Sequence, residues 1–178
     1  MTLPERIVAL HQALEGANIP HAFGGALALA WCTERARGTI DVDVNLFVPP
    51  EQATTVLHAL PSGVAWTADD VSHIARDGQA RLWWDATPVD LFFSTTEFHD
   101  RLESRVRSEP FLGVDIPFLA CRDLAVFKAF FDRTRDWADL EEMAAAGSLD
   151  VGAVLGVLTQ YLGGDDPRVA RLRALTPP

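Results

Sequence analysis

Residues 37–48 read Arg-Gly-Thr-Ile-Asp-Val-Asp-Val-Asn-Leu-Phe-Val, and this stretch decides the fold. From Ile40 to Val48 apolar and polar side chains alternate, which is the period of a β-strand with one buried face. Asp41 and Asp43 share the polar face, with their Cα atoms about 6.5 to 7 Å apart. Their mutual repulsion would cost stability unless a cation lay between them. The stretch therefore predicts a strand with a cation site. The alternative is that the two acids simply lie on the solvent-exposed face of an edge strand.

A pair of glycines, Gly24-Gly25, precedes this strand. It follows a short predicted strand, His21–Phe23, and opens a predicted helix rich in Ala and Leu, Ala26–Trp31. Glycines between a strand and a helix let backbone N–H groups approach a phosphate at the positive end of the helix. The alternative is a tight turn without a ligand.

A third acid, Asp90, stands inside the apolar run Pro88–Phe93. Burying a lone carboxylate is costly unless it is paired or bound to a metal, so Asp90 is expected to face a functional cleft. Three carboxylates without His or Cys ligands favour Mg²⁺ or Mn²⁺ over zinc.

The other elements follow from periodicity and from turn residues. The sequence predicts helices over Leu3–Gly16, Glu51–Leu60 and Glu97–Arg107, strands over Ser72–Arg76, Ala80–Trp84, Val89–Phe93 and Phe111–Ile116, a hairpin turn at Asp77-Gly78, and helices from Arg122 onward. This order predicts an α+β fold with a mixed β-sheet flanked by helices. Residues 1–120 are expected to form the α/β core, and residues 121–178 a C-terminal helical segment packed on the same core.

Composition limits the classes of function. The 178 residues are 48% hydrophobic and 22% charged, which is typical of a folded globular protein. The net charge of −10 argues against a general binder of nucleic acid. No export signal or membrane-spanning stretch is evident, so a cytoplasmic protein is expected. Cys32 and Cys121 lack the spacing of a zinc site and are expected to be buried free thiols.

Taken together, Gly24-Gly25-Ala26-Leu27-Ala28 and the motif at residues 37–44 resemble the signature of the minimal nucleotidyltransferase superfamily, a glycine turn followed by Arg-x-Thr-x-Asp-x-Asp. That superfamily carries its third acid on a later strand, as Asp90 is placed here. The chain is most similar to bacterial nucleotidyltransferases of the AbiEii and related groups. Their helix Leu-x-x-x-Lys and the motif Arg-x-Lys-Asp-x-x-Asp-Leu correspond here to residues 124–128 and 133–140.

The resemblance implies roles for individual residues. Asp41, Asp43 and Asp90 would bind two metal ions, with Asp90 also the general base for the acceptor hydroxyl. The nucleotide phosphates would contact Gly24, Gly25 and Lys128, where Lys128 has the alternative of a solvent-facing helical lysine. Arg37 and Thr39 would orient the acidic strand or meet the nucleotide. Asp136 and Asp139 are expected to pair structurally with Arg133 or Arg135.

The function expected from this resemblance is Mg²⁺-dependent transfer of a nucleoside monophosphate from a triphosphate such as ATP to an acceptor hydroxyl. The resemblance leaves the acceptor open, and it could be RNA or tRNA, a protein, or a small molecule such as an antibiotic. One form of such an enzyme is a toxin with a protein antitoxin as its partner. Two alternatives are a non-catalytic nucleotide-binding module of a two-protein system and a hydrolase or unrelated protein with chance acids. The last expects Asp90 to lie far from Asp41 and Asp43.

Overall fold

The computed structural model describes residues 1–36 and 38–175, and the chain divides into two compact units. The first unit comprises Met1–Leu27 and Gly38–Leu119. The second comprises Ala28–Arg37 and Ala120–Pro178, apart from residues 37 and 176–178, which lie outside the described part. The second unit thus begins within one residue of the predicted boundary but also takes in residues 28–36. The expectation that both parts share one core stays a prediction.

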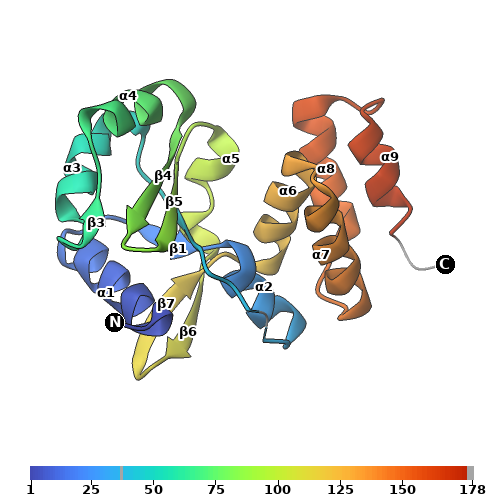
Figure 1. Ribbon diagram of the computed structural model, residues 1–178. Helices are drawn as coiled ribbons and strands as arrows, with labels where there is room; N and C mark the ends of the chain where they lie inside the picture. The colour runs from blue at the N-terminus through green and yellow to red at the C-terminus, as the bar shows by residue number, and fades with distance from the viewer. Residues whose placement is uncertain (37, 176–178) are drawn as a thin grey trace. The chain divides into compact units, whose positions relative to one another are not determined.

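The first unit is built on a mixed β-sheet, as the sequence predicts (Figure 1). Its seven strands among the described residues are β1 (His21–Phe23), β2 (Val42–Leu46), β3 (Val64–Ala65), β4 (Gln79–Trp84), β5 (Thr87–Phe93), β6 (Arg107–Phe111) and β7 (Val114–Phe118). They lie in the order β3-β4-β5-β2-β1-β7-β6. β2 pairs in parallel with β5 and β1 with β7, while the other neighbours are antiparallel.

The middle strand β2 follows the predicted alternation. Val42, Val44 and Leu46 are fully buried, whereas Asp43 on the other parity is only partly buried. Burying one apolar parity fixes the register of the strand, because a slip of one residue would turn these side chains outward. The side chain of Asp43 therefore keeps to the other face.

Helices of the first unit are α1 (Leu3–Gly16), α3 (Ala53–Ala59), α4 (Ala68–Asp77) and α5 (Glu97–Asp100), with short 3₁₀ turns at Pro50–Gln52 and Glu103–Arg105. α1, α3 and α4 run along the same side of the sheet in Figure 1. α1 begins with a capping box between Thr2 and Glu5 and buries Ile7, Leu10 and Leu14 at helical spacing. The predicted helix at 51–60 is confirmed as the turn at 50–52 followed by α3.

The predicted strand Ser72–Arg76 is wrong, because these residues belong to α4. A capping box between Thr67 and Asp70 starts the helix, and Ile74 anchors it in the core. Gly78 ends it in the left-handed conformation, with φ of 69°. The Asp77-Gly78 pair is thus a helix C-cap rather than the predicted hairpin turn.

Two further predictions need correction between residues 97 and 118. The helix predicted to reach Arg107 ends at Asp100, and Arg107 already begins a strand. The predicted strand 111–116 is the middle of a hairpin in which β6 and β7 are joined through Leu112 and Gly113. Both turn residues have positive φ, 49° and 83°, which is the backbone of a tight hairpin turn.

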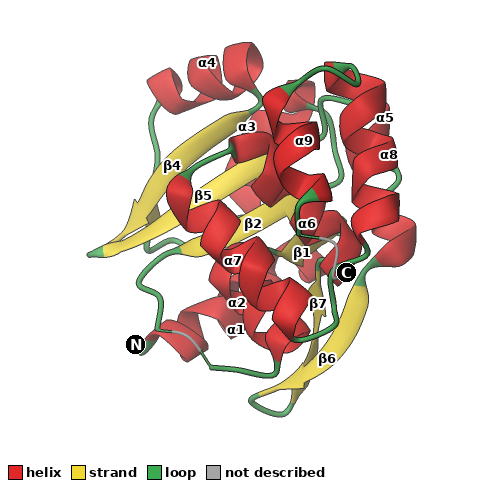
Figure 2. Cartoon of the chain, turned by 90° about the vertical axis from the view of Figure 1, so that its right-hand side faces the viewer, coloured by secondary structure: helices red, strands yellow, loops and turns green. Residues whose placement is uncertain are grey.

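The second unit is helical, as predicted from Arg122 onward. Its C-terminal part consists of α6 (Cys121–Phe131), α7 (Thr134–Ala145), α8 (Val151–Leu162) and α9 (Pro167–Arg173), shown in red in Figure 2. α6 packs against α7, α8 and α9, and α8 packs against α9. The helices bury Leu124, Trp137, Leu140 and Leu158. None of the helices in residues 1–36 and 38–175 combines the length and apolar character that crossing a bilayer requires.

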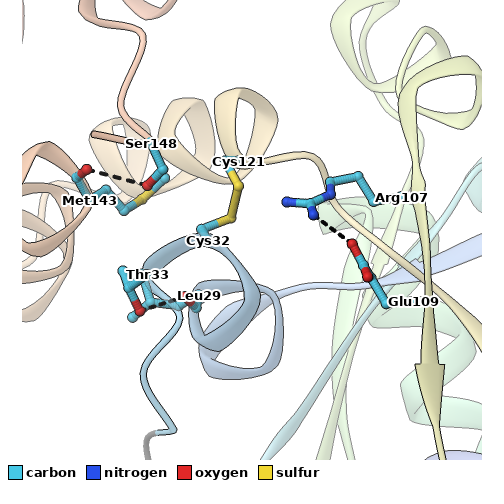
Figure 3. The surroundings of a disulfide bond; sticks show 8 residues. All are labelled: Leu29, Cys32, Thr33, Arg107, Glu109, Cys121, Met143 and Ser148. Atoms are coloured by element: carbon cyan, nitrogen blue, oxygen red, sulfur yellow. Dashed lines mark hydrogen bonds and ion pairs between the residues drawn. A yellow bond between two sulfur atoms is a disulfide. The ribbon is translucent and has the colours of Figure 1, made fainter. Parts of the chain in front are cut away.

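A disulfide joins Cys32 to Cys121, so the expectation of two free thiols is wrong (Figure 3). Cys32 lies near the C-terminal end of α2 (Gly25–Thr33), and Cys121 is the first residue of α6. The two cysteines are 89 positions apart in the sequence, and their pairing could not be predicted because it depends on a Cα separation, here 5.5 Å, that only the fold provides. The bond closes a long loop and so restricts the unfolded chain.

Candidate functional site

Four residues form a row across the neighbouring strands β4, β5, β2 and the end of β1. Asp43 and Asp90 are direct partners in the parallel pairing of β2 with β5, and Asp90 and Arg81 are direct partners in the antiparallel pairing of β5 with β4. On the other side, the Gly24 N–H donates to the Asp43 carbonyl at 2.9 Å. Opposed residues project to the same face of a sheet. We call Arg81, Asp90, Asp43 and Gly24 the acid row.

The glycine turn touches the Asp43 carboxylate directly. Gly25 is the first residue of α2, has φ of 51°, and a β-carbon built on it would lie 1.8 Å from Asp43 Oδ2. A β-carbon on Gly24 would lie 2.7 Å from Asn45 Nδ2. Side chains at positions 24 and 25 would therefore fill the space that Asn45 and the acid occupy, which explains both glycines.

Replacing Gly25 with alanine should therefore displace the Asp43 carboxylate and strain the turn. We expect the free energy of unfolding to fall by about 1–3 kcal/mol, because alanine disfavours positive φ and its β-carbon overlaps the acid. Urea unfolding measures this. Gly156→Ala in α8, where no atom lies within 4 Å of the added β-carbon, is the control and should be neutral or stabilising by up to about 1 kcal/mol. Equal behaviour of the two variants would contradict this account.

Asp41 immediately precedes β2, and its position is set by Thr39. The Thr39 hydroxyl donates to Asp41 Oδ1, and the Asp41 N–H lies 3.3 Å from that hydroxyl oxygen. These contacts fit the predicted role of Thr39 in orienting the acidic strand, while a contact between Thr39 and nucleotide stays a prediction. The role predicted for Arg37 falls on a residue outside the described part of the chain.

Arg81 holds Asp90 through two parallel hydrogen bonds, and sequence reasoning did not find it. Nε donates to Oδ1 at 2.7 Å and the second guanidinium nitrogen to Oδ2 at 2.6 Å. These hydrogen bonds and the charge of Asp90 raise the pKa of Arg81 above its ordinary value, and the charges of Asp41 and Asp43 add to the rise. Arg81 thus lies within the field of all three acids. Arg81 alternates in β4 with the buried Leu82 and Trp84 and so points away from the core, but its partner depends on strand register, which the sequence does not reveal.

The chemistry of the acid row suits a hard divalent cation. Among the described residues, no three His, Cys, Asp or Glu side chains are grouped to hold one metal ion. Asp41 and Asp90 are instead engaged by Thr39 and Arg81, while Asp43 and Asp90 stand side by side in register. Mg²⁺ is usually held by one or two carboxylates together with waters and substrate phosphates, so this donor set fits it. The predicted metal ligands Asp41, Asp43 and Asp90 stay a prediction.

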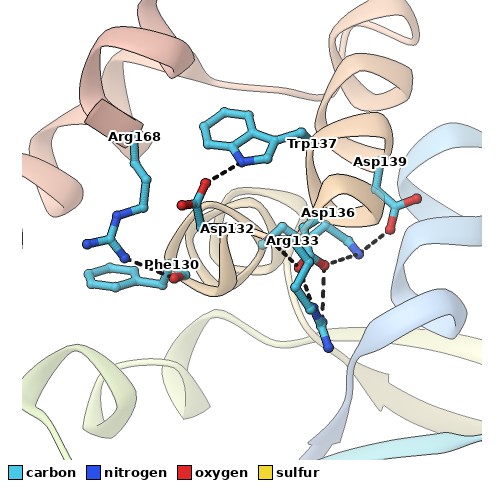
Figure 4. Close-up of polar contacts among 8 residues, drawn as sticks. Phe130, Asp132, Arg133, Asp136, Trp137, Asp139 and Arg168 are labelled. Carbon is cyan, nitrogen blue, oxygen red and sulfur yellow. Dashed lines mark hydrogen bonds and ion pairs between the residues drawn. The ribbon is translucent and has the colours of Figure 1, made fainter. Parts of the chain in front are cut away.

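Lys128 lies in the second unit and is buried, not solvent-facing. Its Nζ lies 2.5 Å from Asp139 and 3.7 Å from Asp136, and both acids are buried. Arg133 also pairs with Asp136, with Nε to Oδ2 at 2.6 Å (Figure 4). The expected structural pairing is therefore confirmed for Asp136 and Arg133, whereas Asp139 pairs with Lys128. The predicted contact of Lys128 with a phosphate stays a prediction.

Comparison with known proteins rests on solved structures. No family model matches the sequence, and no curated protein matches it significantly. ANT(2'')-Ia in complex with adenylyl-2''-tobramycin is 14% identical, with a TM-score of 0.58 over 98% of this chain and 96% of that one. The solution structure of the antibiotic-resistance factor ANT(2'')-Ia gives 13% identity and a TM-score of 0.57 over 96% and 89%.

An antigenic nucleotidyltransferase-like protein from Paracoccidioides brasiliensis is also similar, with 13% identity and a TM-score of 0.55 over 97% of this chain and 92% of that one. At these identities the likeness concerns the fold, which agrees with the fold that the glycine turn and the acidic strand predict. The particular resemblance to AbiEii proteins is not among these findings and stays an expectation. The chain has the minimal nucleotidyltransferase fold.

Proposed function

We propose that this chain is a Mg²⁺-dependent nucleotidyltransferase, which transfers a nucleoside monophosphate from a nucleoside triphosphate to a hydroxyl group of its acceptor. The observation that carries the proposal is the acid row, in which Asp43 and Asp90 are direct cross-strand partners beside the glycine turn. Two acids without a shared function would not be expected to be cross-strand partners beside a glycine turn. The nucleotidyltransferase fold supports the same conclusion.

In this proposal each residue of the site has a defined task, and Asp90 has two. The backbone at Gly24 and Gly25 approaches the phosphates, because no side chain stands in the way. Asp43 and Asp90, with Asp41 oriented by Thr39, would hold the divalent cations. A bound cation neutralises charge on the phosphate oxygens and favours ionisation of the attacking hydroxyl.

The proposed reaction is an in-line displacement at the α-phosphorus. The acceptor oxygen forms a bond to that phosphorus, the bond from phosphorus to the bridging oxygen of the leaving group breaks, and pyrophosphate departs. Asp90 accepts the proton of the acceptor hydroxyl as general base. Holding the two reactants in line supplies much of the rate enhancement.

For the acceptor we propose a small hydroxylated molecule, with ATP as donor. The complex of ANT(2'')-Ia with adenylyl-2''-tobramycin supports this choice, since that protein has the same fold and its bound molecule is an adenylylated antibiotic. The net charge of −10 also suits a small acceptor better than an RNA. RNA and protein acceptors, and an antitoxin partner, are other outcomes that acceptor screening would reveal.

Ligand-induced stabilisation tests the proposed site. Mg²⁺ with a non-transferable ATP analogue should raise the melting temperature, by the equivalent of about 2.7 kcal/mol at a ligand concentration 100 times Kd. Asp41→Asn should weaken this shift while leaving the ligand-free protein equally or more stable, because its charge no longer repels that of Asp43. Differential scanning fluorimetry measures both, with exposed Asp115→Asn on β7 as control. A loss of several kcal/mol without ligand would instead make Asp41 a structural acceptor.

A further inference from the structure

We propose that Arg81 is a built-in counter-ion of Asp90, which competes with divalent cations in the nucleotide-free protein and transfers to the triphosphate when nucleotide binds. This inference rests on the proposed function, because it assumes that the acid row binds a cation and a nucleotide. It assigns Arg81 as a positioning residue that makes the binding of the two ligands interdependent.

Arg81 and Asp90 form a pair whose geometry blocks a cation from Asp90. The guanidinium occupies both oxygens of Asp90, at 2.7 and 2.6 Å. Arg81 and Asp90 are also direct partners in the pairing of β4 with β5, so the backbone itself holds them opposite each other. A cation can therefore coordinate Asp90 only by displacing at least one of these hydrogen bonds.

The two partners differ in their exposure to solvent. The Arg81 side chain is 56% exposed, whereas that of Asp90 is 13% exposed. The arginine can thus swing away into solvent or onto a ligand, while the acid stays in the sheet. Because the guanidinium is exposed to solvent, the pair contributes less to stability than a fully buried pair would, so exchange of the arginine to another anion costs little.

The oxygens of a bound triphosphate are a suitable alternative partner for Arg81. A guanidinium binds phosphate oxygens with the same two-pronged geometry that it uses for a carboxylate. Triphosphate bound at the neighbouring glycine turn would offer such oxygens and would free Asp90 for the cation. Nucleotide and cation should therefore each strengthen the binding of the other, as reciprocal linkage requires.

Two binding measurements on Arg81→Gln test the inference, and neither depends on turnover. Mn²⁺ titration of the nucleotide-free protein, followed by the electron paramagnetic resonance of free Mn²⁺, should show about fivefold tighter binding in the variant, since the competing ion pair is gone. Titration with an α,β-methylene analogue of ATP, without divalent cation, should show weaker binding in the variant. Arg81→Lys, which keeps the charge but loses the planar fork, should lie between.

Arg76→Gln is the matched control, because Arg76 also forms a two-pronged pair, with Asp77 on α4, and its loss changes the net charge equally. The inference is overturned if Arg81→Gln binds Mn²⁺ no more tightly than Arg76→Gln does. Asp43→Asn separates the two proposals. If it binds Mn²⁺ as tightly as the wild type, the acid row is not the cation site, and the proposed function fails whatever Arg81 does. Melting curves establish that each variant is folded.

Discussion

Replacing Asp90 with asparagine should lower the rate of nucleotidyl transfer by about 10² to 10⁴, the usual effect of losing a general base. The amide keeps the shape of the side chain but cannot accept the proton of the acceptor hydroxyl. Binding of the triphosphate should change much less, because Asp41, Asp43 and the glycine turn are intact. Single-turnover transfer, measured beside nucleotide titration, separates the two effects.

The structure adds one control that this experiment needs. Asp90→Asn also breaks the pair with Arg81, so Arg81→Gln should be measured in parallel to separate loss of the pair from loss of the carboxylate. Exposed Asp115→Asn should leave transfer unchanged. Near-normal turnover by Asp90→Asn would show that another group removes the proton.

Lys128→Met should lower the free energy of unfolding by about 3–5 kcal/mol, because it leaves buried Asp139 without its lysine. Asp136 is still paired with Arg133 in this variant, so most of the lost stability comes from the broken contact between Lys128 and Asp139. Urea unfolding measures the loss. The double variant Lys128→Met with Asp139→Leu should recover part of the stability, since it removes the buried carboxylate together with the lysine that neutralises it.

Arg135→Met, at an exposed position of α7, is the control for the charge change and should be nearly neutral. The experiment also separates two roles of Lys128, the only lysine in the chain. If Lys128→Met lost less than about 1 kcal/mol while nucleotide affinity fell, the lysine would be a phosphate contact rather than the centre of a buried ion-pair network.

Local patterns predicted much of the fold. The alternation in residues 40–48 gave the buried face of β2, and Gly24-Gly25 marked the turn into α2, because both features depend on residues adjacent in sequence. Helical spacing likewise predicted α1 and the helices after Arg122. In the predicted helices and in β2, the regular spacing of apolar residues continues long enough to distinguish a helix from a strand.

The errors come from short elements whose local signals conflict. Residues 71–76 carry Val71 and Ile74 in a short polar stretch, and the Asp77-Gly78 pair suits a hairpin as well as a helix end. The capping box at Thr67 decides between them, but only with the helix boundary known. The sequence predicts only one strand in place of the β6–β7 hairpin, because Leu112 stands at a turn position with positive φ where Asn, Asp or Gly is usual.

Contacts between distant residues could not be predicted from local patterns. Cys32 pairs with Cys121 and Arg81 with Asp90 because the fold brings them together. For the acids, the sequence predicted which face Asp41 and Asp43 share but not which residue stands opposite. Strand order and register supply that information, and they placed Asp90 beside Asp43.

The fate of each phosphate tests the central claim most directly. The protein is incubated with Mg²⁺, candidate hydroxylated acceptors and ATP labelled at either the α- or the γ-phosphorus, and the products are separated. A nucleotidyltransferase attaches the α-label to the acceptor and releases the γ-label as pyrophosphate, and both events should slow by about 10² to 10⁴ with Asp90→Asn. Transfer of the γ-label to the acceptor, or its release as orthophosphate without acceptor modification, would contradict the account.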